Sequence, residues 1–271
     1  MTDRNSGYFA FLMEKGDTVI RKGAAGATAG FFVANEALAG YARNLDWNLI
    51  GHSKFLFAGT HGVGRGLDEA RLVWETIPEQ LRALGPDAVA KRLDGFDWSH
   101  IVPYSKGGGN EAANGIFEFA GPNRARGAEQ MSGAEIETAA QVLSQTAFKA
   151  ALEEVASRAL TGAAMGAAVT CVLSCLEHGL EYQRNNIGRD EMFRRIRREV
   201  IRSAAIGAAV SGIVSAVALA YPAVIPLAAP LILVLALLGF FVVGSKVVHL
   251  GKGWYEVYRE SPTIGFSIRF A

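Results

Sequence analysis

Two apolar runs near the C-terminus constrain the fold of this chain more than any other feature of its sequence. Residues 203–221 and residues 222–244 contain no charged residue. An uncharged run of about 18 residues or more can cross the hydrocarbon core of a bilayer as a helix, and a soluble domain of this length has too little interior to bury two such runs. Prolines at 222, 226 and 230 favour a tight turn between the runs or the first turn of the second helix. The sequence therefore predicts a transmembrane hairpin, with a buried hairpin in a soluble protein as the alternative.

A third apolar segment, residues 159–176, is long enough to span but consists mainly of Ala, Gly, Thr and Ser. Its Gly162 and Gly166 have GxxxG spacing, which permits close helix contact in lipid. We therefore expect the Gly/Ala-rich helices to support a homo-oligomer. Because this segment is the least hydrophobic of the three, we expect it to pack against the others without spanning. A three-span arrangement is the alternative.

The stretch between the apolar segments, residues 177–202, carries seven arginines and places its apolar residues at helical spacing. Such a helix is expected to lie in a membrane interface, where arginine reaches lipid phosphates. Lys and Arg outnumber Asp and Glu by 12 to 7 in residues 158–271, but are outnumbered 15 to 19 in residues 1–157. This distribution predicts a lipid bilayer as a partner. Because no signal-peptide pattern opens the sequence, we expect an integral inner-membrane protein with a cytoplasmic N-terminal head.

Residues 97–132 have a different character and read DWSHIVPYSKGGGNEAANGIFEFAGPNRARGAEQMS. His100 is followed by the glycines 107–109 and by asparagines at 114 and 123. A histidine has a pKa near neutrality and can activate water. Hard cations such as Mg²⁺ accept oxygen ligands, which an Asn side chain offers. These residue types are the ones that metal-assisted cleavage of a phosphodiester requires.

This stretch resembles the HNH nuclease family, in its variant with Asn in place of the last His. The resemblance rests on SHIVPYSKGGGNEAANG followed by NRARGAEQMS. It implies a β-hairpin and a helix arranged around one divalent metal, Mg²⁺ or Mn²⁺, with nucleic acid, most simply DNA, as the substrate.

The same resemblance assigns roles to individual residues. His100 is the expected general base, Asn114 orients it through the loop, and Asn123 is a metal ligand. The residues expected to face the phosphate backbone are Lys106, Arg124 and Arg126. Ser99 stands where most members carry an acidic metal ligand. Asp97 shares the strand face of Ser99, so it is the expected substitute, bound to the metal directly or through water.

Helical spacing and capping signals predict helices over residues 27–43, 67–84 with a break at Pro78, and 85–96. Ser132 and Glu135 have capping-box spacing, so a further helix should begin there and continue into the apolar segment 159–176. The histidines outside the motif show no metal-ligand spacing and are interpreted as surface or packing residues. They are His52, His61, His178 and His249.

The predicted fold is mostly α-helical, with a small ββα unit and an α-helical membrane hairpin in the C-terminal half. The expected parts are a helical region at 1–96, the ββα unit at 97–131, connecting helices at 132–202, the hairpin at 203–250 and a tail at 251–271.

Two functions remain open. One is a membrane-anchored nuclease that hydrolyses DNA or RNA, in defence or as a toxic effector. The other is a non-catalytic membrane scaffold or pore-forming protein in which the ββα unit serves recognition or assembly. The His and Asn residues of the motif favour the first function. Ser99 and the acidic N-terminal half favour the second.

Overall fold

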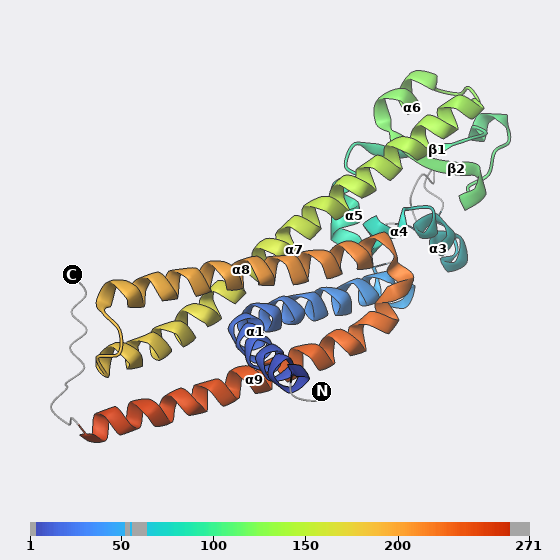
Figure 1. Ribbon diagram of the computed structural model, residues 1–271. Coiled ribbons are helices and arrows are strands. Elements are labelled where there is room, and N and C mark those ends of the chain that lie inside the picture. Colours follow the sequence, from blue (N-terminus) through green and yellow to red (C-terminus); the bar gives the residue numbers. More distant parts are fainter. Residues whose placement is uncertain (1–3, 52–54, 56–63, 261–271) are drawn as a thin grey trace. The chain divides into compact units, whose positions relative to one another are not determined.

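The computed structural model describes residues 4–51, 55 and 64–260, and these residues are mostly helical, which confirms the predicted mostly α-helical class. Long helices dominate the described residues (Figure 1). They are α1 (Arg4–Leu45), α7 (Gly133–Gln183), α8 (Arg189–Ala220) and α9 (Ile225–Glu260). The elements between α1 and α7 are short: η1 (Trp47–Leu49), α3 (Leu67–Glu75), α4 (Glu79–Ala83), α5 (Pro86–Arg92), β1 (Phe96–His100), η2 (Tyr104–Lys106), η3 (Ala112–Asn114), β2 (Gly115–Phe119) and α6 (Ala120–Arg126).

The chain divides into two compact units, which we describe separately. The helical unit comprises Met1–Asn35, Ser157–Val214 and Ala229–Ala271. The head unit comprises Glu36–Ala156 and Ser215–Ala228.

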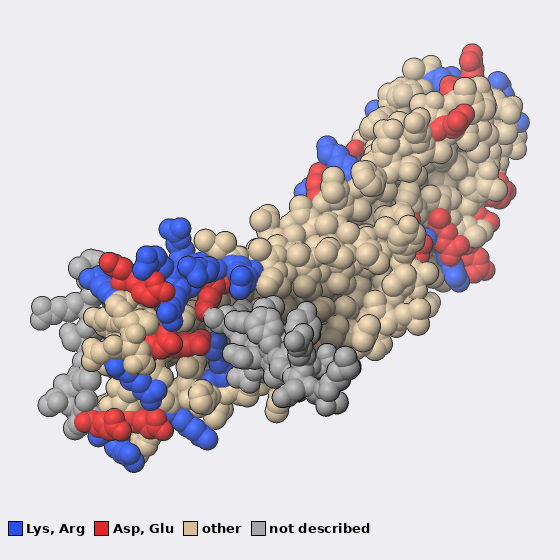
Figure 2. Space-filling view, in the orientation of Figure 1, with Lys and Arg blue, Asp and Glu red and all other residues tan. Residues whose placement is uncertain are grey.

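Three helical stretches, Gly133–Gln183, Arg189–Ala220 and Pro222–Glu260, are long and apolar enough to cross a membrane. In the most apolar 18 residues of Pro222–Glu260, only 11% are buried. Leu227 and Phe241 expose 79% and 78% of their surface. Charged side chains gather over the start of α8 and the end of α9, whereas the apolar parts of the long helices present a broad uncharged surface (Figure 2). These helices are compatible with a membrane protein, because lipid would cover the apolar surface that the chain leaves exposed.

The turn between the two most apolar segments falls where the prolines predict it. Helix α8 ends at Ala220 and α9 begins at Ile225, with η4 (Pro222–Val224) between them. Pro230, in contrast, lies inside α9 and not in its first turn.

The Arg-rich stretch differs from its predicted form. Residues 177–202 do not make a separate helix, because α7 continues to Gln183 and α8 runs unbroken from Arg189 into the apolar segment. Neither Pro nor Gly interrupts residues 189–206, so nothing in the backbone chemistry ends the helix at residue 203.

In the helical unit, α1, α7 and α8 approach one another through small residues. A Cβ built at Gly162 would lie 2.3 Å from the carbonyl oxygen of Gly207, and one built at Gly26 would lie 2.4 Å from that of Ser203. Ser203 Oγ also donates to Gly166 O over 3.0 Å and accepts from Thr170 Oγ1 over 2.6 Å. The GxxxG of α7 is therefore used within the chain, and a homo-oligomer through other faces stays a prediction.

The head unit has a core of aromatic and aliphatic side chains from its short helices, its sheet and α7. Its members include Trp74, Ile77, Leu81, Val89, Trp98, Phe117 and Leu143. Strands β1 and β2 pair antiparallel, with Trp98 opposite Phe117 and His100 opposite Gly115. The ring of Trp98 covers Gly115, where a Cβ would lie 2.3 Å from the indole. This core fixes one face of the sheet and leaves the other for polar side chains.

The helical packing generates a first prediction. Replacing Gly207 by Ala places a methyl group against the α7 backbone, so it should destabilise the helical unit by about 1–3 kcal/mol. Gly244→Ala is the matched control, because no atom lies within 4 Å of a Cβ at that position, and its stability should stay equal or rise by up to about 1 kcal/mol. Thermal unfolding in detergent micelles, followed by circular dichroism, measures both. Unchanged unfolding of Gly207→Ala with loss of an oligomer would show that the contact joins two chains.

Candidate functional site

The loop that joins the two strands is organised by Asn114. Its Oδ1 accepts from Val102 N over 2.9 Å, and its Nδ2 donates to Val102 O and Gly109 O over 3.0 and 2.9 Å. A Cβ at Gly108 would lie 1.8 Å from Val102 O, so the closed loop requires glycine there. Asn114 thus holds the shape of the loop that follows His100. This is compatible with its expected role of orienting His100 through the loop.

His100 ends β1, and its Nε2 lies 3.0 Å from Asn110 Oδ1. Asn110 is itself placed by Arg65, whose Nε donates to Asn110 O over 2.8 Å. Sequence reasoning singled out neither Asn110 nor Arg65 as a site residue. The glycines 107–109 before Asn110 could have indicated its position, because they favour a tight turn. Such a turn brings the next polar residue back toward the end of the strand.

The predicted metal ligands gather on the other face of β1. Ser99 is 2% exposed, and its Oγ donates to Asn123 Oδ1 over 2.9 Å. Asn123 Nδ2 donates to Asp97 Oδ2 over 3.1 Å. Alternation along the strand places Asp97 and Ser99 on one face and His100 on the other. The structure therefore brings Asp97, Ser99 and Asn123 together, while His100 has a different partner.

Arg126 of α6 points into this cluster. Its Nη2 donates to Ser99 Oγ over 2.8 Å, and its guanidinium forms ion pairs with Glu118 of β2 and Glu135 of α7. The side chains of Arg126 and Glu118 are each only 6% exposed. Burial by itself would lower the pKa of Arg126, but the hydrogen bonds that it donates to Glu118 and Glu135 raise the pKa above its ordinary value. A permanently charged guanidinium is therefore built into this face of the sheet.

Glu135 joins this ion pair to the start of α7. The predicted capping box is present, with Glu135 Oε2 accepting from Ser132 N and from Ser132 Oγ over 2.7 Å. Those two hydrogen bonds, together with the one from Arg126, lower the pKa of Glu135 to about 2. Glu135 is thus ionised near neutral pH and balances part of the charge on Arg126.

A divalent metal does not fit this arrangement. Ser99 and Asn123 offer neutral oxygens that are bonded to each other, and Ser99 also accepts from Arg126. The Asp97 carboxylate binds Asn123 and pairs with Arg124 Nε at 3.3 Å. A dication among these groups would sit against a buried guanidinium, and like charges repel strongly where water is excluded.

The residues expected to face nucleic-acid phosphate divide into two kinds. The Arg124 side chain is 75% exposed, and Lys106 is also exposed. Arg126 is buried and points inward, which corrects its expected position, because Glu118 on the neighbouring strand attracts its guanidinium. Glu118 is a further residue that the sequence did not single out, and its partner Arg126 lies eight residues further on.

A second group of ligand-type side chains lies in the helical unit. Among the described residues, a His and carboxylate group with metal-ligating spacing comprises Glu177, His178 and Glu199. The interpretation of His178 as a surface or packing residue is therefore incomplete. His52 and His61 lie outside the described residues.

Comparison with known proteins gives no match: no family model, no curated protein and no solved structure matches this chain.

The buried ion pair generates a second prediction. Arg126→Ala leaves Glu118 buried without its partner and should destabilise the head unit by about 3–5 kcal/mol. Arg124→Ala, two residues earlier on the same helix, removes an exposed ion pair and should change stability by less than about 1 kcal/mol. Urea unfolding of the full chain in a Trp254→Phe background reports on the head unit, because the remaining tryptophans, at 47, 74 and 98, all lie there. Equal effects of the two variants would contradict a structural role for Arg126.

Proposed function

We propose that this chain is an integral membrane protein whose head unit serves recognition or assembly and holds no catalytic metal. The supporting observation is the Arg126 guanidinium bonded to Ser99 and Glu118. In the HNH resemblance, Ser99 and Asn123 stand at the ligand positions of the metal. In this chain the guanidinium of Arg126 supplies the positive charge next to Ser99 that a metal ion would supply in the HNH family.

The membrane part of the proposal follows from the exposed apolar surface of α7, α8 and α9. A lipid bilayer is the partner that fits this surface, because lipid tails can cover apolar side chains that would otherwise be exposed to water. The arginines near the start of α8 favour the cytoplasmic side for that end by the positive-inside tendency. We therefore propose an inner-membrane location, with the head on the side of the α8–α9 turn, because that turn lies within Ser215–Ala228 of the head unit. Trp254, Tyr255 and Tyr258, near the end of α9, are of the types that favour a membrane interface.

The exposed surface of the ββα unit favours binding over a solely structural role. Tyr104 and Lys106 project from the loop after β1, with Tyr104 60% exposed. Arg124 is exposed on α6. Exposed basic and aromatic side chains of this kind suit an anionic partner, and nucleic acid belongs to that class.

An HNH-type nuclease is the second candidate, and the position of His100 favours it. His100 ends β1, is only partly buried, and has Asn110 within hydrogen-bonding distance of its Nε2. That is how a general base is oriented. For a metal to bind in the manner of this family, Arg126 would have to release Ser99 and leave its two carboxylate partners.

A cleavage assay separates the two candidates and is our third prediction. Purified wild type and His100→Ala, incubated with plasmid DNA or single-stranded RNA and Mg²⁺ or Mn²⁺, should give the same background cleavage. Ser99→Asp should gain no activity, because the new carboxylate would pair with Arg126 before it could hold a metal. Metal-dependent cleavage by the wild type that is lost in His100→Ala would establish the nuclease and refute the non-catalytic head.

A further inference from the structure

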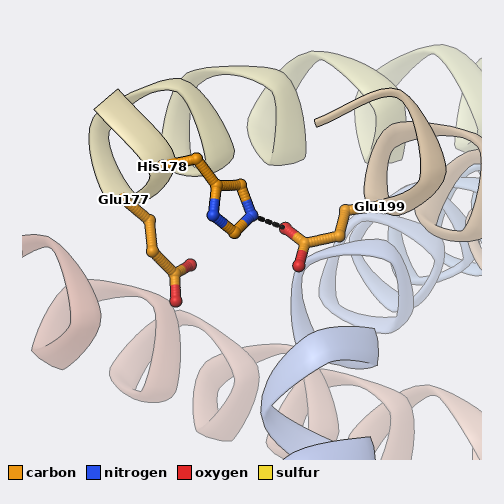
Figure 3. A group of neighbouring side chains, drawn as sticks. All are labelled: Glu177, His178 and Glu199. Carbon is orange, nitrogen blue, oxygen red and sulfur yellow. Dashed lines mark ion pairs between the residues drawn. The ribbon is translucent and has the colours of Figure 1, made fainter. Parts of the chain in front are cut away.

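The helical unit contains a buried histidine placed between carboxylates from two helices. Glu177 and His178 lie on α7, Glu199 lies on α8, and the candidate ligand atoms of the three all fall within 4.8 Å of one another. Figure 3 shows the imidazole between the two carboxylates, with Glu199 facing one ring nitrogen. His178 is 5% exposed, whereas both glutamates are partly exposed. Solutes can thus reach the group from the carboxylate side.

Glu181 fixes the orientation of the imidazole. His178 Nδ1 lies 2.9 Å from Glu181 Oε2, one helical turn further along α7. A carboxylate at Nδ1 favours the tautomer that carries the proton there, which leaves the Nε2 lone pair free to bind a metal. Arg195 of α8, with Nη1 3.3 Å from Glu181 Oε2, holds that carboxylate in place.

Two buried atoms of the group, His178 Nε2 and Glu177 Oε2, have no hydrogen-bond partner among the described residues. Glu199 Oε2 lies 3.3 Å from His178 Nε2. With the proton on Nδ1, two electron-rich atoms face each other at that distance, so a cation between them would be stabilised. Ser174 Oγ donates to Glu199 Oε2 over 2.6 Å and orients the carboxylate toward the imidazole.

Glu177 provides a third carboxylate near His178, in addition to Glu181 and Glu199. Its Oε2 pairs with Lys246 Nζ of α9 at 2.5 Å. Lys246 is therefore the charge against which a bound cation would compete. The charged residues of the group lie outside the uncharged stretches 159–176, 203–221 and 222–244, toward the ends of the helices where charged side chains gather (Figure 2).

We propose that His178 Nε2, Glu199 and Glu177 form a binding site for one divalent transition-metal ion, of which Zn²⁺ is the representative. One imidazole and two carboxylates suit Zn²⁺ or Mn²⁺, whereas Mg²⁺ and Ca²⁺ favour ligand sets made only of oxygens. Three protein ligands leave a coordination position for water. The ion joins α7 to α8 next to the turn between them and stabilises the helical unit. A proton on His178 is the competing occupant, since an imidazolium between Glu181 and Glu199 needs no metal.

The test, our fourth prediction, measures metal binding by the full chain in detergent micelles after removal of metal with a chelator. Wild type should bind one Zn²⁺ per chain by equilibrium dialysis with elemental analysis. Loss of a ligand in His178→Ala or Glu199→Gln should weaken binding by about 100-fold or more, and Glu181→Gln by about 10–100-fold. His249→Ala is the control, because His249 is an exposed histidine of the same unit, and it should bind like the wild type.

Two further measurements keep the test decisive if a ligand variant fails to fold. Lys246→Ala removes the competing charge and should bind Zn²⁺ more tightly than the wild type. Zn²⁺ should also raise the unfolding temperature of the wild type relative to the chelated protein. Absence of stoichiometric binding by a folded wild type, or equal binding by wild type and folded His178→Ala, would overturn the metal site. Neither outcome bears on the head unit.

Discussion

The head unit depends on one buried cation, the guanidinium of Arg126. From α6 it reaches β1 through Ser99, β2 through Glu118 and the first turn of α7 through Glu135. A buried charge is tolerated only when it is paired and hydrogen-bonded, and these three contacts satisfy that condition. They also determine the chemistry of the neighbourhood, because a dication at the same place would meet a fixed positive charge. The side chain that ties the four elements together is thus also the reason why we propose no metal at this place.

The helical unit is packed through different residues from those of the head unit. Its helices expose large apolar side chains such as Leu227 and Phe241 and pack internally through Gly162, Gly207 and Ser203. Small residues at the contacts are typical of helix association in lipid, where burial of apolar surface gives little driving force. Charged side chains are absent from the apolar stretches 159–176, 203–221 and 222–244, and His178 meets its carboxylates just outside the first of them. The same chain therefore combines a head with a water-excluding core and helices whose apolar surface requires lipid.

Local structure was largely predictable from the sequence, because it depends on neighbouring residues. The helix start at the Ser132–Glu135 capping box and the break at Pro78 lie where the sequence predicts them. Two strands and a short helix also follow residue 95, an order that the HNH resemblance implies and local spacing does not. The partners of Arg126 and His178 were not predictable. Glu118 contacts Arg126 because the strand pairing brings it there, and Glu199 faces His178 because two long helices pack side by side. Such contacts depend on tertiary packing, which residue spacing does not reveal. The spacing of His178 and Glu181 on one helical face was a local signal that pointed to an oriented imidazole.

Whether Arg126 occupies the place of a catalytic metal can be seen by locating bound manganese. Crystals of the full chain grown with excess Mn²⁺ would reveal each bound ion by its anomalous scattering. We expect no manganese peak within coordination distance of Ser99 and Asn123, with Arg126 still bonded to Ser99 and Glu118. A manganese ion coordinated by Asn123, with the guanidinium of Arg126 displaced, would contradict this expectation.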